Sequence, residues 1–159
     1  MSKHPVEDFM REAIAQAFAA RASGDYAIGA AVAMDGKLIA LGRNRVKIDN
    51  DPTQHAEMVA IRKACRIAES RHIPGAVLYT TVEPCPMCAS AAIWARMAGI
   101  VSGSTIDDMA AFRSKFGSDD WSWRTVDLAA REVLRSGEPV LFLEEGFLRD
   151  ECRALFHHD

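Results

Sequence analysis

The chain has little of what membrane-inserted or secreted proteins need. No uninterrupted apolar run approaches the roughly 18 residues that a membrane span requires, and the N-terminal region lacks the continuous apolar stretch of a secretory signal. Only four cysteines are present, and two of them share one short motif, which leaves no convincing disulfide framework. These absences predict a protein of the reducing cytoplasm with no membrane association.

An excess of basic residues is also missing. Lysine and arginine number 19 against 22 acidic residues, so the formal net charge is -3 and the isoelectric point is near 5.9. The field of the whole molecule therefore does not favour polyanions, which argues against nucleic acid as the main partner. A local cluster of Arg43, Arg45 and Lys47 is the place where such a partner could still bind.

The size and apolar content are those of one domain that covers residues 1–159. With 159 residues, of which 49% are hydrophobic, the chain is long enough to bury a substantial core, and no repeat or low-complexity tract interrupts it. Hydrophobic periodicity and turn residues divide it into alternating elements. Helices are expected at 5–22, 52–70, 85–98, 125–136 and 147–156, and strands at 27–34, 37–41, 76–82, 100–104 and 139–143.

This alternation predicts an α/β protein, a three-layer α/β/α sandwich with a five-stranded mixed sheet. Asp35-Gly36 is typical of a tight hairpin, so the first two strands are expected to be antiparallel. Asp51 is the expected N-cap of the second helix, which puts His55 in its first turn. The segment 109–123 has no clear periodicity and is expected to be a lid or an interface loop, although its aromatic residues could equally pack beneath it.

Two short strings carry the chemistry, HAE at 55–57 and PCPMC at 84–88. A catalytic zinc ion takes three protein ligands and leaves its fourth position open. His55, Cys85 and Cys88 supply such a set, and the two cysteines stand three apart on the opening turn of a helix, whose dipole favours their thiolate forms. Glu57 is then left off the metal, where it can act as general acid and base.

A closed structural zinc site is the alternative, because a fourth protein ligand would exclude water from the metal. The remaining cysteine and C-terminal histidine side chains are the candidates for it, although Cys65 lies more than two helical turns beyond His55. These candidates are Cys65, Cys152, His157 and His158.

The combined strings resemble the signature of zinc deaminases of nucleobases, and the chain is identified as a member of the cytidine deaminase superfamily. Within it, the chain is similar to the bacterial branch that holds guanine deaminases and tRNA adenosine deaminases. The likeness covers most of the chain and is carried by residues 28–30, 42–44, 51–57, 83–88, 92–96 and 145–152.

The resemblance implies roles for further residues. Asn44 would hydrogen-bond the ring of the substrate, and the backbone at Ala56 and Cys85 would line the pocket. Without the family, a turn residue would be the better interpretation of Asn44. Guanine deaminases tend to have an aromatic residue where this chain has Ile28, and an acidic residue that recognises the guanine amino edge. Asp120, followed by Trp121, is the nearest candidate, and a solvated acidic turn at Asp119 and Asp120 is an equal alternative.

These observations predict zinc-dependent hydrolytic deamination of a purine base or nucleoside, with guanine favoured and release of ammonia. The alternatives are a tRNA adenosine-to-inosine deaminase, a deaminase of another small aminated heterocycle such as cytosine, a pterin or an aminotriazine, and a non-catalytic zinc-stabilised binding protein. The resemblance also implies a homodimer, formed through the cysteine helix with Trp94 and Met97, which would serve equally well in a monomer core.

Overall fold

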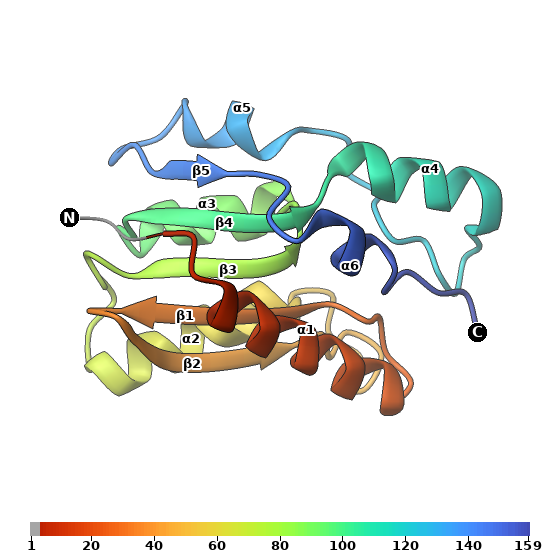
Figure 1. Cartoon of the computed structure of the whole chain (residues 1–159), viewed down its shortest axis with the longest axis horizontal. Helices are drawn as coiled ribbons and strands as arrows, with labels where there is room; N and C mark the ends of the chain where they lie inside the picture. Colours follow the sequence, from red (N-terminus) through yellow and green to blue (C-terminus); the bar gives the residue numbers. More distant parts are fainter. Residues whose placement is uncertain (1–3) are drawn as a thin grey trace.

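The computed structural model describes residues 4–159 and has a five-stranded sheet at its centre (Figure 1). Its strands are β1 (Gly29–Met34), β2 (Lys37–Arg43), β3 (Val77–Val82), β4 (Gly99–Ser104) and β5 (Phe142–Glu144). They lie in the order β2-β1-β3-β4-β5. The strand β1 runs antiparallel to β2 and β3, whereas β3, β4 and β5 are parallel, so the predicted mixed sheet is confirmed.

Helices cover both faces of this sheet. They are α1 (Glu7–Ala22), α2 (Ala56–Ala68), α3 (Pro86–Trp94), α4 (Ile106–Phe116), α5 (Ala130–Leu134) and α6 (Arg149–Arg153). Figure 1 shows α1 and α6 on one face and α2 and α3 on the other, with α4 beyond the end of β4, and α5 packs against α3. The predicted three-layer arrangement is therefore confirmed. Among residues 4–159, no helix has the length and apolarity needed to cross a bilayer.

The sheet brings distant segments of the chain together at one end of its strands. Because β1 is antiparallel to both β2 and β3, the C-terminal ends of β2 and β3 lie beside the N-terminal end of β1. Asn44 follows β2, Cys85 comes shortly after β3, and Tyr26 precedes β1. The N-termini of α2 and α3 also lie there, and helix N-termini favour negative charge such as thiolates.

Glycine allows the two helical layers to approach the sheet closely. A Cβ added to Gly29 would lie 1.9 Å from the carbonyl oxygen of Ala13 in α1, and one added to Gly42 would lie 2.3 Å from the carbonyl oxygen of Ala56 in α2. Any side chain at either position would push its helix off the sheet. Close helix packing is thus the reason for Gly29, and the expected Asp35-Gly36 hairpin is also present, with both residues at positive φ.

Several predicted boundaries are wrong. Helix α2 begins at Ala56, so His55 is its N-cap and does not lie in its first turn. The expected cap Asp51 instead closes a local turn, because its Oδ1 accepts hydrogen bonds from the backbone and hydroxyl of Thr53. The helices expected at 125–136 and 147–156 are shorter in the structure, where they are α5 and α6. The strand expected at 139–143 is β5, at Phe142–Glu144.

The segment 109–123 is not a continuous loop, because α4 occupies its first half. A capping box starts this helix: the Thr105 hydroxyl accepts the Asp108 backbone N–H, and the Asp108 carboxylate accepts the Thr105 N–H. A bidentate ion pair from Arg149 in α6 adds to it. Only the part after Gly117 is irregular, and we call residues 118–126 the wall segment.

Candidate metal centre and active-site cavity

His55 is held at the start of α2 by a neighbouring element rather than by its own side chain. The residue is the N-cap, yet it makes no side-chain capping bond. The Asn44 Oδ1, from the turn after β2, instead accepts the Ala56 N–H at 3.3 Å. The first free N–H of α2 is therefore satisfied, and the imidazole is left available for another partner.

Cys85 and Cys88 lie on the first turn of α3, as N-cap and third helical residue. Their Sγ atoms are 3.7 Å apart, and each lies 3.5 Å from Nδ1 of His55. A tetrahedral zinc ion with Zn–S near 2.3 Å and Zn–N near 2.0–2.1 Å separates its donors by about 3.8 Å for S···S and about 3.5 Å for S···N. The three donors therefore fit zinc, as the sequence predicted.

A closed structural site finds no support among residues 4–159. The donor group there consists of His55, Cys85 and Cys88, with all donor atoms within 4.8 Å of one another and no fourth member. Cys65 instead lies near the Arg71 carbonyl, and the buried Cys152 fills the space over Gly103. A donor set with one position open to solvent is typical of catalytic zinc.

The three donors share hydrogen bonds and charges that shift their pKa values in different directions. The hydrogen bond with Cys88 is the main reason that the pKa of Cys85 falls to about 4, and the same bond, with burial, raises the pKa of Cys88. Burial lowers the pKa of His55, but the hydrogen bond with Cys85 and the charge of Glu57 outweigh it and leave that pKa raised. One negative charge is thus already stabilised, and a dication would favour the second thiolate.

Glu57, in the first turn of α2, is buried and is not part of the donor group. Its exposed fraction is 2%, and burial raises the pKa of its carboxyl group, with the charge of His55 acting in the opposite direction. A carboxyl group with a raised pKa is a better proton acceptor than an ordinary carboxylate. This is the property that a proton carrier beside the metal requires.

A cavity of about 410 Å³ opens beside the donors. Of the predicted residues it is lined by Ile28, Asn44, His55 and Cys85, while Ala56 is buried just behind it. Its other lining residues are Tyr26, Val46, Pro52, Pro86, Met87, Ser122, Trp123, Arg124, Thr125 and Val126. The volume lies within the range usual for small-molecule sites.

The structure does not bring Asp120 or Trp121 to this cavity. Asp120 is exposed, and its carbonyl oxygen lies 3.3 Å from the Tyr26 hydroxyl. The Trp121 ring packs edge-on against Tyr26 and His157 and lies 3.6 Å from the Lys47 ammonium. The neighbours Ser122, Trp123 and Arg124 line the cavity instead, because the wall segment turns inward two residues later than expected.

Asp25 was missed by sequence reasoning. This carboxylate is completely buried and accepts four hydrogen bonds, from the backbone N–H groups of Tyr26, Lys47 and Ile48 and from the side chain of Asn44. A carboxylate only accepts, so it fixes the Asn44 amide with nitrogen toward Asp25 and oxygen toward Ala56. One N–H of Asn44 is left without a bond to Asp25, and Asn44 lines the cavity.

Arg124 was also missed. Its guanidinium is buried and donates to the carbonyl oxygens of Glu83 at 2.6 Å, Val126 at 2.9 Å, Leu128 at 3.0 Å and Pro84 at 3.4 Å. It therefore ties the wall segment to the turn that carries Cys85. No local motif marks this arginine, since its main partner is 41 positions away.

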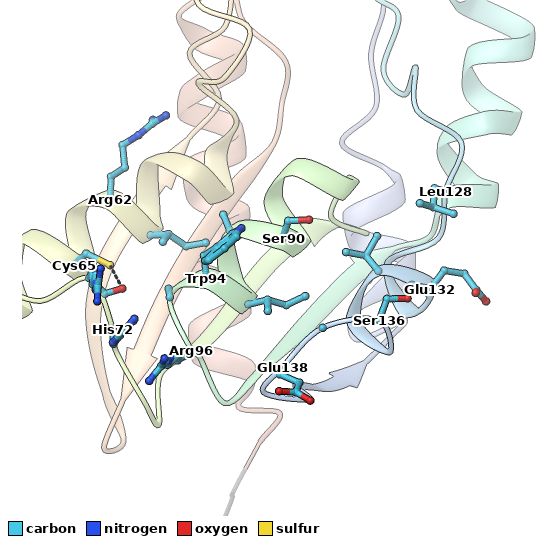
Figure 2. A pocket seen from close by; sticks show the side chains of 17 residues that line it. Arg62, Cys65, His72, Ser90, Trp94, Arg96, Leu128, Glu132, Ser136 and Glu138 are labelled. Carbon is cyan, nitrogen blue, oxygen red and sulfur yellow. Dashed lines mark hydrogen bonds between the residues drawn. The ribbon is translucent and has the colours of Figure 1, made fainter.

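A second, larger hollow of about 1050 Å³ lies on the outer face of α3, and Figure 2 shows it. Trp94 stands at its centre and is 81% exposed. Arg62, His72 and Arg96 lie to one side of Trp94, and Glu132 and Glu138 to the other (Figure 2). It contains none of the zinc donors and is therefore a separate feature of the surface.

Comparison with known proteins agrees with this geometry. The chain is 41% identical over 105 residues to the guanine deaminase of Bacillus subtilis, a match that spans 65% of each chain and so slightly less than two thirds. It is 39% identical over 149 residues to the tRNA-specific adenosine deaminase of the same organism, which is 94% of this chain and 84% of that one. The solved structure of guanine deaminase from Nitrosomonas europaea matches with a TM-score of 0.78 and 26% identity, covering 95% of this chain and 82% of that one.

The family model for the cytidine and deoxycytidylate deaminase zinc-binding region matches residues 3–104, which include all three donors and Glu57. The fold, the donor geometry and the sequence relatives lead to the same conclusion. The chain belongs to the cytidine and deoxycytidylate deaminase family and carries its zinc-binding region.

Proposed function

We propose that the protein is a zinc-dependent hydrolytic deaminase of a free purine base or nucleoside, which replaces an exocyclic amine by a carbonyl and releases ammonia. One observation carries this proposal: a three-donor group with zinc geometry borders a cavity of about 410 Å³, and the buried carboxyl group of Glu57 is close enough for the charges of His55 and Cys85 to shift its pKa. An open metal site beside a proton carrier is the arrangement that hydrolysis needs.

The side chains can divide the reaction among themselves. When bound, zinc supplies Lewis acidity that lowers the pKa of a water toward neutrality. Glu57 would take the first proton of the attacking water to the ring nitrogen, and then the second, from the added hydroxyl group, to the departing amine, so that the carbonyl forms as the carbon–nitrogen bond breaks. The remaining N–H of Asn44 donates to an acceptor on the ring, while Trp123 and Ile28 exclude water from its faces. Water and amine enter, and carbonyl product and ammonia leave.

Guanine is the favoured substrate, chiefly because of the likeness to guanine deaminases. The cavity does not strengthen this preference, since Asp120 lies outside it and the side chains that line it include no carboxylate. A screen for ammonia release by the zinc-loaded protein decides the substrate. It should cover guanine, guanosine, adenine, adenosine, cytosine, cytidine, pterins and aminotriazines.

Deamination of adenosine in a tRNA anticodon loop is the second candidate, favoured by a likeness that extends over 94% of the chain. The basic cluster offers it limited support, because Arg45 pairs with Asp49 at 2.9 Å and the Lys47 ammonium lies on the Trp121 ring. Salt-sensitive binding of an anticodon stem-loop, followed by inosine formation, would establish it. Zinc binding without ammonia release from any base or RNA would instead support a non-catalytic zinc protein.

We also infer that the protein forms a homodimer through the face around Trp94. A large exposed aromatic residue between a basic and an acidic group suits a two-fold interface, because the basic side of one copy then meets the acidic side of the other. Met97 is only 2% exposed, so its expected place in this interface is wrong and it belongs to the core. Sedimentation of wild type and Trp94→Glu tests the inference, with a monomeric variant expected.

A cytoplasmic location stays a prediction.

A further inference from the structure

His157, in the segment that follows α6, is buried and hydrogen-bonded at both ring nitrogens. Its exposed fraction is 4%, its Nε2 accepts the backbone N–H of Ala27 at 3.2 Å, and its Nδ1 lies 3.1 Å from Oδ1 of Asp159. Arg21 of α1 donates to both carboxylate oxygens of Asp159, at 2.7 and 2.8 Å. The imidazole thus connects the tail of the chain to the residues just before β1.

These contacts fix the state of the ring. A nitrogen that accepts a backbone N–H carries no proton, so His157 is neutral and its proton lies on Nδ1, which donates to Asp159. Burial is the main reason that the pKa of His157 is lowered, and Arg21 acts in the same direction while Asp159 opposes it. The ring is therefore neutral at ordinary pH and remains an acceptor for Ala27.

Two segments that line the cavity meet at this residue. The Trp123 indole N–H donates to the backbone carbonyl oxygen of His157 at 2.8 Å, and the Trp123 ring lies edge-on to the imidazole at 5.4 Å. Ala27, which donates to the imidazole, precedes Ile28, which also lines the cavity. Tyr26 also joins the start of β1 to the wall segment, because its hydroxyl accepts the Ser122 N–H at 2.9 Å and its ring contacts Trp123.

We propose that His157 is a positioning residue that holds the wall segment and the start of β1 at the spacing a flat heterocycle requires. It touches neither the donor group nor Glu57, so it acts on substrate affinity and not on the chemical step. The kinetic part of this proposal rests on the proposed deaminase function. Its structural part, the protection of the Ala27 amide, does not.

Two substitutions separate the acceptor from the bulk of the ring. His157→Leu removes the acceptor, whereas His157→Gln keeps an acceptor oxygen near the position of Nε2. The adjacent and exposed His158 provides the matched control as His158→Gln. Each variant is characterised by hydrogen exchange of the Ala27 amide, by zinc content, and by kcat and KM for the base that the wild type deaminates fastest.

His157→Leu is expected to raise KM about three- to tenfold, the effect of one lost hydrogen bond, with kcat within about twofold. Exchange at Ala27 should become about tenfold faster, zinc content should stay at that of wild type, and His157→Gln should restore both values. A Leu variant with wild-type KM and exchange, or a Gln variant as impaired as Leu, overturns the proposal.

If His157→Leu does not fold, His157→Asn replaces it, because its shorter amide does not reach the Ala27 N–H. It should raise KM and speed exchange at Ala27 in the same way, and unchanged values would contradict the role. If the wild type deaminates nothing, the proposed function fails, while the difference in Ala27 exchange between His157→Leu and His157→Gln still decides the positioning role.

Discussion

The donor group and the wall segment border the same cavity, but they are built in different ways. The donors His55, Cys85 and Cys88 come from two short motifs, although Asn44 from another element caps the helix that follows His55. The wall segment has no helix or strand and depends on distant partners of Arg124 and His157. The identity of the metal donors is therefore encoded in short motifs, whereas the shape of the cavity beside them depends on long-range contacts.

The largest effect is expected from removing a donor. Cys88→Ser should lose zinc and destabilise the fold by at least about 3 kcal/mol, because the metal joins the starts of α2 and α3 and its binding energy is folding energy. Metal analysis and thermal unfolding measure both changes. Cys65→Ser is the control, since Cys65 lies outside the donor group and should keep zinc. Equal zinc content in both variants would break the assignment.

Glu57→Gln is expected to separate metal binding from catalysis. The amide fills the same buried space but cannot carry a proton. Ammonia release should therefore fall by about 10²- to 10⁴-fold while zinc remains bound. Steady-state kinetics on the zinc-loaded variant provides the measurement. A rate equal to wild type would remove Glu57 from the reaction.

Arg124→Met should affect the wall segment more than the donors. It leaves the carbonyl oxygens of Glu83, Val126 and Leu128 without their donor, which we expect to cost about 2–4 kcal/mol and to raise KM. Denaturant unfolding and KM for the identified substrate test this. Unchanged stability together with unchanged KM would show that the two regions are independent of this arginine.

A smaller effect is expected at Asp108, away from the cavity. Arg149 is the main cause that holds its pKa at about 2, below the 3.8 of the free group. A lowered pKa stabilises the fold above the unfolded value, and this contribution is lost as the pH falls through the folded value. Asp108→Asn should therefore cost about 1–2 kcal/mol at pH 7, a value reduced because Arg149 is half exposed, and the difference from wild type should vanish between pH 4 and 2.

The Asp108 prediction has a control in the exposed pair of Arg11 and Glu151. These side chains are each about half exposed and 2.7 Å apart. Glu151→Gln should change stability less than Asp108→Asn, because surface ion pairs are screened by solvent. A larger effect at Glu151 would contradict the distinction between buried and exposed pairs.

The parts that the sequence could predict are those with local causes. The zinc donors and the Asp35-Gly36 hairpin follow from motif spacing and turn residues. The start of α4 could also have been found, since Thr105 and Asp108 have capping-box spacing. Single-domain organisation stays a prediction.

The predictions that were wrong concern features that depend on the tertiary structure. Asp51 had the features of an N-cap, but its carboxylate closed a turn two residues long, and Asn44 capped α2 from another element. The inward turn at Trp123 depends on the His157 carbonyl, 34 positions away, so no window of sequence around Asp120 could indicate which residues would line the cavity.

The most direct test of the central claim is X-ray absorption at the zinc edge of the purified protein. Two sulfurs at about 2.3 Å, one imidazole nitrogen at about 2.0–2.1 Å and one further light atom from solvent are predicted. A third sulfur or a second imidazole in the first shell would mean a closed site and would contradict the account.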